Sequence, residues 1–454
     1  MKRKALSFIL LLLSVTSYSQ ITSSFDTDDD GVLYDEASFW NLGEGWVPIG
    51  SDSDPFAAVF EGNGHAISNL YINRPYESDI GLFGVIKNTA TIQNLHLGGS
   101  LTAISGGDNV GALLGRISLG DEYTVIIDNC SYSGSVTGSQ YVGGLIGNIY
   151  TFYDGYADIY DSYTDADVVG ENHVGGLIGY SFAELYGYIF VYNSYAQGEA
   201  EGDDKVGGLI GTLKYDKGNI MISASSSDAS ATGDNGIGGL LGATDGSGYD
   251  GILNVQKSHA NGDVVASSGN SGGLIGDVQA DIDAVATVRK SYATGDVSGV
   301  YNVGGLAGYM YADSWISLAV SDSYASGDVA GISSVGGLVG MAVAKEEAAT
   351  ISINKTYAVG AVSGYANTGG LIGLAVDNYD PEDPYSGRVN VSRSYWDTVT
   401  TGQSTSSGDG TGLTTTEMQC PQSPGDSSCA TSVYSGWSTS TWDFGSASEY
   451  PTLQ

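Results

Sequence analysis

A six-residue pattern built around paired glycines recurs along most of this 454-residue chain. It reads VGGLIG at 142–147, 174–179 and 206–211, and IGLFG is a degenerate first copy. The first glycine of successive copies, which we term glycine boxes, stands at Gly81, Gly111, Gly143, Gly175, Gly207, Gly238, Gly272, Gly304, Gly336 and Gly369. A spacing of 30 to 34 residues, held over ten copies, predicts a chain of stacked structural repeats.

Two further segments repeat with the same period. A signature such as NSYAQGEA (193–200), KSYATGDV (290–297) or DSYASGDV (322–329) precedes most boxes, and KSHANGDV (257–264) is a variant. A strand-like segment such as YIFVYN or TISINK precedes each signature. Each repeat therefore holds about three short strands separated by turn residues, and helical periodicity is absent from the sequence.

This organisation predicts an all-β fold in which each repeat forms one coil. We expect a right-handed parallel β-helix, or β-solenoid, of about ten coils stacked about 4.8 Å apart. A β-propeller is the alternative, but its blades need about 40 residues each. The aliphatic residues of the boxes are expected to fill the core, with one column formed by Leu113, Leu145, Leu177, Leu209, Leu240, Leu274, Leu306, Leu338 and Leu371.

The chain divides into four segments. Residues 1–19 are typical of a secretory signal peptide, with a basic start, an apolar run and a small-residue cleavage site. Residues 20–79 are expected to form an N-terminal cap with an acidic loop, 80–397 the solenoid, and 398–454 a Ser/Thr/Gly-rich C-terminal cap, because open solenoid ends need covering. The sequence contains no second long apolar run, so we expect no transmembrane segment and a secreted or surface location.

The net charge limits which classes of partner the sequence favours, and the cysteines indicate where a disulfide is expected. The net charge is −36 at pH 7, which disfavours binding to nucleic acid and to anionic membranes and favours divalent cations. Cys420 and Cys429 flank a short loop, and export makes a disulfide between them plausible. Cys130 lies in a repeated strand and is expected to be an inert thiol.

The boxes and their flanking segments resemble the GLUG-motif repeat family of secreted and surface bacterial proteins, which also occurs in the non-catalytic part of immunoglobulin-A-specific metallopeptidases. The resemblance covers about 80–397, with GWVPIG and FEGNGHAISNLYI before it and the segment 394–419 after it. It implies an exported bacterial β-solenoid, adhesive in character. The overall style of the sequence, including the end of the signal peptide, resembles that of Gram-negative Bacteroidetes, so we expect a secreted, surface or outer-membrane-associated protein. The family has no well-defined activity of its own.

Catalytic motifs are missing from the sequence. The four histidines, at positions 65, 96, 173 and 259, are not followed by Glu, so the His-Glu-x-x-His motif of a metallopeptidase is absent. No pair of His or Cys has zinc-ligand spacing within the repeats. We therefore expect a protein that is not an enzyme and requires no cofactor. The alternative is a β-helical polysaccharide-degrading lyase or glycoside hydrolase.

The best candidate for a metal site is the acidic segment DTDDDG. Asp26, Asp28 and Asp30 match the front half of a calcium loop, in which hard oxygen atoms surround the ion. The twelfth position is Ala37 instead of Glu, and Asp35 or Glu36 is a candidate replacement for the missing ligand. The alternative is a solvated acidic segment without a metal.

Two rows of side chains follow the period of the repeat. An acidic row precedes an inward Val or Ala and is expected to point outward; it consists of Asp167, Glu199, Asp263, Asp296 and Asp328. A tyrosine row has two open orientations, inward as core packing or outward as a ladder of aromatic platforms, and a bend just before it would reconcile the signals. It contains Tyr132, Tyr163, Tyr195, Tyr292, Tyr324, Tyr357 and Tyr395, with Ser226 and His259 as replacements.

These observations favour an adhesin-like or structural binding protein whose repetitive surface contacts a glycan, matrix or protein partner. The candidate ligand-binding residues are Tyr163, Tyr195, Tyr292, Tyr324 and Tyr357. An enzyme would be expected to interrupt the repeat pattern at one cleft, and the sequence shows no such interruption.

Overall fold

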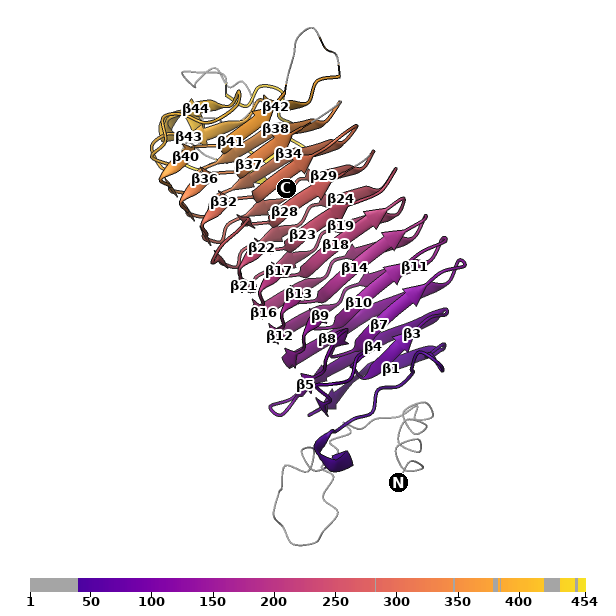
Figure 1. The fold of residues 1–454 in the computed structure, drawn as a ribbon. Helices are drawn as coiled ribbons and strands as arrows, with labels where there is room; N and C mark the ends of the chain where they lie inside the picture. Colours follow the sequence, from indigo (N-terminus) through magenta and orange to yellow (C-terminus); the bar gives the residue numbers. More distant parts are fainter. Residues whose placement is uncertain are drawn as a thin grey trace.

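The computed structural model describes residues 40–454 except 282, 346–347, 379–382, 384, 420–432 and 446–447. It is an all-β solenoid of about ten coils, stacked along one axis from the N-terminal to the C-terminal side (Figure 1). In the described residues every pairing between named strands is parallel except that of β45 (Trp442–Asp443) with β46 (Thr452–Leu453). Parallel stacking confirms the predicted solenoid and excludes the propeller, whose blades are antiparallel.

Two sheets carry the glycine boxes. The ten-stranded sheet contains β3 (Phe83–Ile86), β7 (Leu114–Leu119), β10 (Ile146–Thr151), β14 (Ile178–Glu184), β18 (Ile210–Asp216), β23 (Leu241–Gly246), β28 (Ile275–Ala280), β33 (Ala307–Ala312), β37 (Val339–Ala344) and β41 (Ile372–Asp377). The nine-stranded sheet contains β6 (Val110–Gly111), β9 (Gln140–Gly143), β13 (Asn172–Gly175), β17 (Asp204–Gly207), β22 (Asn235–Gly238), β27 (Ser271–Gly272), β32 (Tyr301–Gly304), β36 (Ser333–Gly336) and β40 (Ala366–Gly369).

The 25-stranded sheet supplies the rest of each coil in two rows. The first row contains β1 (Val59–Ser68), β4 (Ala90–Gly98), β8 (Thr124–Thr137), β11 (Tyr156–Tyr160), β15 (Tyr188–Tyr192), β19 (Asn219–Ser223), β24 (Ile252–Gln256), β29 (Val285–Arg289), β34 (Ser317–Ala325), β38 (Thr350–Ala358) and β42 (Arg388–Ser392). The second row contains β2 (Tyr71–Asn73), β5 (Ala103–Ser105), β12 (Tyr163–Val169), β16 (Tyr195–Glu201), β20 (Ser226–Ser227), β21 (Ser230–Gly233), β25 (His259–Ala260), β26 (Val264–Ala266), β30 (Tyr292–Ala293), β31 (Val297–Ser298), β35 (Val329–Ala330), β39 (Val362–Ser363), β43 (Tyr395–Asp397) and β44 (Thr411–Leu413). β4, β8, β34 and β38 run through the bend and contribute to both rows.

The glycine box joins a strand of the nine-stranded sheet to one of the ten-stranded sheet. In the copy at 142–147, Val142, Leu145 and Ile146 are fully buried. A Cβ atom on Gly144 would lie 2.1 Å from the carbonyl oxygen of Gly176 in the next coil, so the backbones approach too closely for any side chain. The predicted leucine column is confirmed, because all nine leucines are at most 1% exposed. The box therefore builds the scaffold.

A bend separates the two rows of the 25-stranded sheet. One residue per coil adopts a left-handed conformation there, with φ between 47° and 55°, in ten consecutive coils: Asn94, Asn129, Asp161, Asn193, Ala224, Lys257, Lys290, Asp322, Lys355 and Arg393. This bend turns the chain immediately before the tyrosine row. The bend postulated from the sequence is therefore present. It interrupts the alternation of side chains and so changes which residues of the signature face inward.

A buried serine ladder follows the bend. The backbone N–H of Ser194 donates to Oγ of Ser225 in the next coil, and that hydroxyl donates to the carbonyl of Ser223. The same pair of hydrogen bonds, at 3.2–3.3 Å and 2.7–3.0 Å, recurs at Ser162, Ser258 and Ser291. The serine of the signature thus satisfies backbone donors that the bend removes from the sheet.

The two ends of the stack differ. At the N-terminal end, β1 already pairs in parallel with β4, so the stack begins within the segment expected to be a cap. At the C-terminal end, Trp396 pairs with Ala358 and is 5% exposed, and its indole N–H donates to the carbonyl of Gln403. The short helices η2 (Trp40–Gly43) and α2 (Thr415–Met418) lie in these end segments. Among the described residues, no helix has the length and apolar character needed to cross a bilayer.

Candidate binding surface

The tyrosine row faces outward. Ser194 and Ala196 point into the solenoid, whereas Tyr195 between them is 38% exposed. Neighbouring rings stack at strand spacing: the centroids of Tyr163 and Tyr195 are 4.9 Å apart at an interplanar angle of 3°. The stack resumes after Ser226 and continues through His259, Tyr292, Tyr324 and Tyr357 with centroid distances of 4.7–4.9 Å. The side chains of the row therefore point outward, with their ring faces turned toward one another along the stack.

Tyr132 does not belong to this row, and its assignment to it is corrected. It pairs with Thr164, whereas Ser131 occupies the row position beside Tyr163. Tyr132 points inward, is 1% exposed, and donates its hydroxyl hydrogen to the carbonyl of Ser135. The signature of this coil has one extra residue between the bend and the tyrosine, and a shift of one residue moves a side chain to the opposite face.

The C-terminal segment 433–454 covers one end of the ladder. Tyr324 and Tyr357 are only 8% and 2% exposed, and they form a second apolar cluster with Tyr434, Trp437 and Trp442. The hydroxyl of Tyr357 donates to the carbonyl of Pro451 at 2.6 Å, and the Trp442 indole N–H donates to Asp322 at 3.3 Å. Two of the five predicted ligand-binding tyrosines are thus occupied by the chain itself, and Tyr163, Tyr195 and Tyr292 remain accessible in part.

The acidic row points outward, as expected, and part of it has a structural role. All five carboxylate-bearing residues are exposed. Oδ1 of Asp263 accepts the backbone N–H of Asp296, Oδ1 of Asp296 accepts that of Asp328, and Oδ1 of Asp328 accepts that of Ala361, each at 2.8–2.9 Å. The carboxylates of later coils therefore replace missing sheet hydrogen bonds between coils. Charge-assisted hydrogen bonds of this kind offset the repulsion between stacked acids.

Cys130 is a structural thiol. It occupies the first position of the serine ladder, where its backbone N–H donates to Oγ of Ser162. The side chain is 1% exposed, and burial raises the pKa of the thiol to about 12. The expected inertness follows, because the reactive thiolate is disfavoured at neutral pH.

The remaining predicted site residues lie outside the described residues. These are the calcium candidates Asp26, Asp28, Asp30 and Asp35, the disulfide candidates Cys420 and Cys429, and the signal peptide 1–19. In the part of the chain that the structure describes, no group of three or more His, Cys, Asp or Glu is placed to hold a metal ion.

An aromatic pocket lies on the outer face of the ten-stranded sheet, which the sequence did not predict. It occupies about 250 Å³ and is lined by two outward residues from each of three neighbouring strands. Arg116, Asn148 and Tyr180 pair across β7, β10 and β14 as one column; Ser118, Tyr150 and Phe182 form the second column. We call these six residues the aromatic grid.

Further rings surround the grid. The Tyr150 ring centroid is 5.3 Å from that of Phe182 and 5.0 Å from that of Phe152. Tyr141 lies 4.9 Å from Tyr180. The hydroxyl of Tyr150 donates to Glu184. The rings thus pack against one another, and a lining of aromatic side chains is typical of a ligand-binding pocket.

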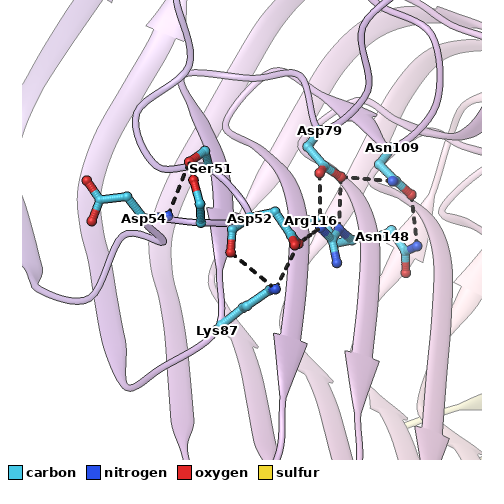
Figure 2. A network of polar contacts seen from close by, with 9 residues as sticks. Ser51, Asp52, Asp54, Asp79, Lys87, Asn109, Arg116 and Asn148 are labelled. Atoms are coloured by element: carbon cyan, nitrogen blue, oxygen red, sulfur yellow. Dashed lines mark hydrogen bonds and ion pairs between the residues drawn. The ribbon is translucent and has the colours of Figure 1, made fainter.

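A polar network forms one side of the grid (Figure 2). Arg116 makes a two-pronged ion pair with Asp79, at 2.9 and 3.0 Å, and its Nη2 also contacts Asp52 at 2.6 Å. Lys87 lies 2.8 Å from the same Asp52 carboxylate. Asn109 donates to Asp79, and Asn148 donates to Asn109, each at 2.9 Å. The network fixes the side chains at the polar end of the pocket.

Among the described residues that line the pocket, the positive charge is paired with carboxylates. Hydrogen bonds from Lys87 and Arg116 lower the pKa of Asp52 to about 2, so this carboxylate stays ionised opposite the two cations. Burial lowers the pKa of His173, beside Tyr180, to about 4. Its imidazole is therefore neutral at pH 7, and its Nδ1 lies 2.8 Å from the hydroxyl of Thr212.

A signal for the grid is present in the sequence, although it is weak. In the strand after each box, the two outward positions are held by Asn148 and Tyr150 in one coil and by Tyr180 and Phe182 in the next. The two coils that follow carry Thr212 and Lys214, then Ala243 and Asp245. Aligning the strands that follow the boxes would have revealed adjacent aromatic residues in two neighbouring coils, with Tyr309 and Tyr311 returning in one later coil. The boxes themselves dominate the periodic pattern and conceal this local departure.

Comparisons with known proteins identify only partial relatives. No family model and no solved structure matches the chain. A segment of 89 residues is 40% identical to a "Putative Gly-rich membrane protein" of Evansella cellulosilytica, covering 20% of this chain and 10% of that protein. A segment of 111 residues is 38% identical to "Halomucin" of Haloquadratum walsbyi, covering 24% of this chain and 1% of that protein. The similarity thus spans a small part of either relative.

Proposed function

We propose that this protein is an exported, surface-located solenoid that acts by binding a partner through the outward side chains of its early coils. The observation that carries this proposal is the concentration of aromatic side chains on two outer faces between residues 141 and 195. Equivalent positions of the next three coils carry Thr, Lys, Ala, Asp and Gln without loss of the fold, and tyrosines return there at Tyr309 and Tyr311. The scaffold does not need these rings, so a binding role explains them better than packing.

The second aromatic face supports the same proposal. The rings of Tyr156 and Tyr188 stack with centroids 4.8 Å apart at 3°, and Tyr160 meets Phe190 edge to face. These side chains lie on the first row of the 25-stranded sheet, next to the open Tyr163–Tyr195 pair. Half-exposed aromatic clusters of this kind are typical of surfaces that contact glycans or proteins.

The surface location rests on three supports. Residues 1–19 are typical of a signal peptide, the repeats resemble the GLUG family, and the partial relatives are named as a membrane protein and as Halomucin. The proposal extends to calcium, which would bind to the acidic segment 26–35. Calorimetric titration of the mature chain with calcium is expected to give heat that a variant carrying Asp26→Asn and Asp28→Asn lacks; equal heats would refute this part.

The binding proposal is tested on an array of glycans and matrix proteins. We expect the mature chain to bind at least one class of target, and the double variant Tyr150→Ala/Phe182→Ala to lose most of that binding. Tyr311→Ala is the matched control, because Tyr311 occupies the same column of the same sheet five strands further on. Equal loss in the control, or unchanged binding by the double variant, would contradict the proposal.

One observation favours a polysaccharide-degrading enzyme as a second candidate. Asp277 lies on the same outer face, is 7% exposed, and has a pKa raised to about 6 by burial, although Gln279 and Asn270 donate hydrogen bonds to it. A carboxyl group protonated near neutral pH is what a glycoside hydrolase uses as general acid. Release of reducing sugar by the wild type that Asp277→Asn abolishes would establish this candidate; no release would remove it.

A further inference from the structure

The hydrogen-bond relay of the polar network has only one possible direction. The Asp79 carboxylate only accepts hydrogen bonds, so Asn109 must turn its amide nitrogen toward Asp79. Its amide oxygen then faces Asn148, which must donate to it. The amide oxygen of Asn148 is left at the pocket end of the relay.

That oxygen is an unsatisfied acceptor. Oδ1 of Asn148 is buried and has no hydrogen-bond partner within the protein, and Asn148 lines the pocket. A buried acceptor without a partner costs free energy, so the relay presents a site that favours a ligand with a hydrogen-bond donor. This observation is independent of the aromatic rings.

Size and charge restrict the class of ligand. A volume of about 250 Å³ falls below the range of about 300–1,000 Å³ that is usual for drug-sized ligands, which suits a single ring. Arg116 is neutralised by Asp79 and Asp52, and Lys214 over the Phe182 ring pairs with Asp245 at 3.3 Å. With a chain charge of −36, an anionic ligand is disfavoured.

We propose that the aromatic grid binds one pyranose ring of an uncharged glycan, with its apolar C–H face against Tyr150 and Phe182 and a hydroxyl donating to Oδ1 of Asn148. This inference rests on the proposed function and specifies its ligand. A sugar ring combines apolar faces with hydroxyl donors at its rim, and the grid combines aromatic walls with a buried acceptor that has no partner within the protein. The glycan chain extends along the outer face of the sheet in either direction.

The test is calorimetric titration of the mature full-length chain with cellohexaose, mannohexaose and the anionic hexagalacturonate. We expect one neutral hexasaccharide to bind, and hexagalacturonate to bind at least tenfold more weakly. The double variant Tyr150→Ala/Phe182→Ala should lose about tenfold or more in affinity, and Tyr311→Ala should match the wild type. Preference for hexagalacturonate, or unchanged binding by the double variant, would overturn the inference.

A pairwise test isolates Asn148. Among monodeoxy derivatives of the bound sugar, one should lose about tenfold in affinity for the wild type, as expected for one hydrogen bond. The same derivative should lose nothing for Asn148→Ala, whose folding is checked by circular dichroism. An equal penalty in both proteins would show that the hydroxyl contacts another group and would refute this assignment.

The array separates this inference from the broader proposal. If Tyr150→Ala/Phe182→Ala loses binding to a matrix protein while no neutral glycan binds, the glycan inference falls and the binding surface stands. If the double variant keeps every interaction of the wild type, the binding surface itself is wrong.

Discussion

The two halves of the tyrosine ladder share one geometry and differ in what lies over them. Tyr163 and Tyr195 stack at 4.9 Å and 3°, and Tyr324 and Tyr357 stack at 4.9 Å and 1°. Tyr195 is 38% exposed, whereas Tyr357 is 2% exposed beneath the C-terminal segment. The solenoid thus sets the spacing and direction of the row, and the segment packed against it decides which rungs are open to a partner.

The largest effect is expected from breaking the scaffold that both halves share. Leu209 belongs to the core leucine column and is fully buried. It lies in the part of the chain between Tyr195 and His259, where the two halves of the ladder meet. Leu209→Asp places an unpaired carboxylate in this core, which should cost about 4 kcal/mol or more. A thermal melt followed by circular dichroism should show a large loss of stability. A melt identical to that of the wild type would contradict the stacked core.

Removing one ring from each half compares them directly. Tyr357→Ala opens a cavity in the C-terminal aromatic cluster and should cost about 3–5 kcal/mol. Tyr195→Ala removes a stacked but exposed ring and should cost about 1 kcal/mol. Urea unfolding of the two variants measures both values. Equal costs would mean that the covered and open halves are not distinct.

A smaller effect is expected from the hydroxyl group alone. Tyr357→Phe keeps the ring and leaves the carbonyl of Pro451 without its buried donor. The expected cost is about 1–3 kcal/mol, localised to the C-terminal segment. Limited proteolysis should cleave within 433–454 faster in this variant, while Tyr195→Phe should behave as the wild type does. No change in the cleavage rate would indicate that this segment is held by other contacts.

The smallest effect concerns alkaline pH. Burial raises the pKa of Tyr357 well above its usual value near 10, and it also raises the pKa of Tyr324. The stability due to these protonated tyrosines is fully present below pH 10 and is lost as pH rises through their folded-state values. Tryptophan fluorescence should report loosening of the C-terminal segment above pH 10 and none between pH 7 and 9. A loosening complete below pH 9 would contradict this assignment.

The repeat made the scaffold predictable and left most of the surface unpredicted. The period of the glycine boxes gave the coil, and the aliphatic residues between the glycines gave the core column. The coil and the core column both depend on contacts that every coil repeats, so the ten copies of the box carry the same information about them.

Features that occur once were harder to predict. Tyr132 was wrongly placed in the tyrosine row because one extra residue follows the bend at Asn129. The C-terminal segment was expected over the open end of the stack, yet it also lies along the side, where Trp442 contacts Asp322 at a separation of 120 residues. The aromatic grid combines residues from three coils through strand register, which single-sequence periodicity does not supply.

The most direct test of the account is chemical footprinting of the tyrosines. Nitration of the native protein, read by mass spectrometry, should modify Tyr163 and Tyr195 and spare Tyr132, Tyr324 and Tyr357. In the variant Trp442→Ala, modification should spread to Tyr324 and Tyr357 because their cover is loosened, with Tyr132 still protected in the core. Modification of Tyr357 in the native protein at the rate of Tyr195, or protection of Tyr195 equal to that of Tyr132, would contradict an outward ladder divided by the C-terminal segment.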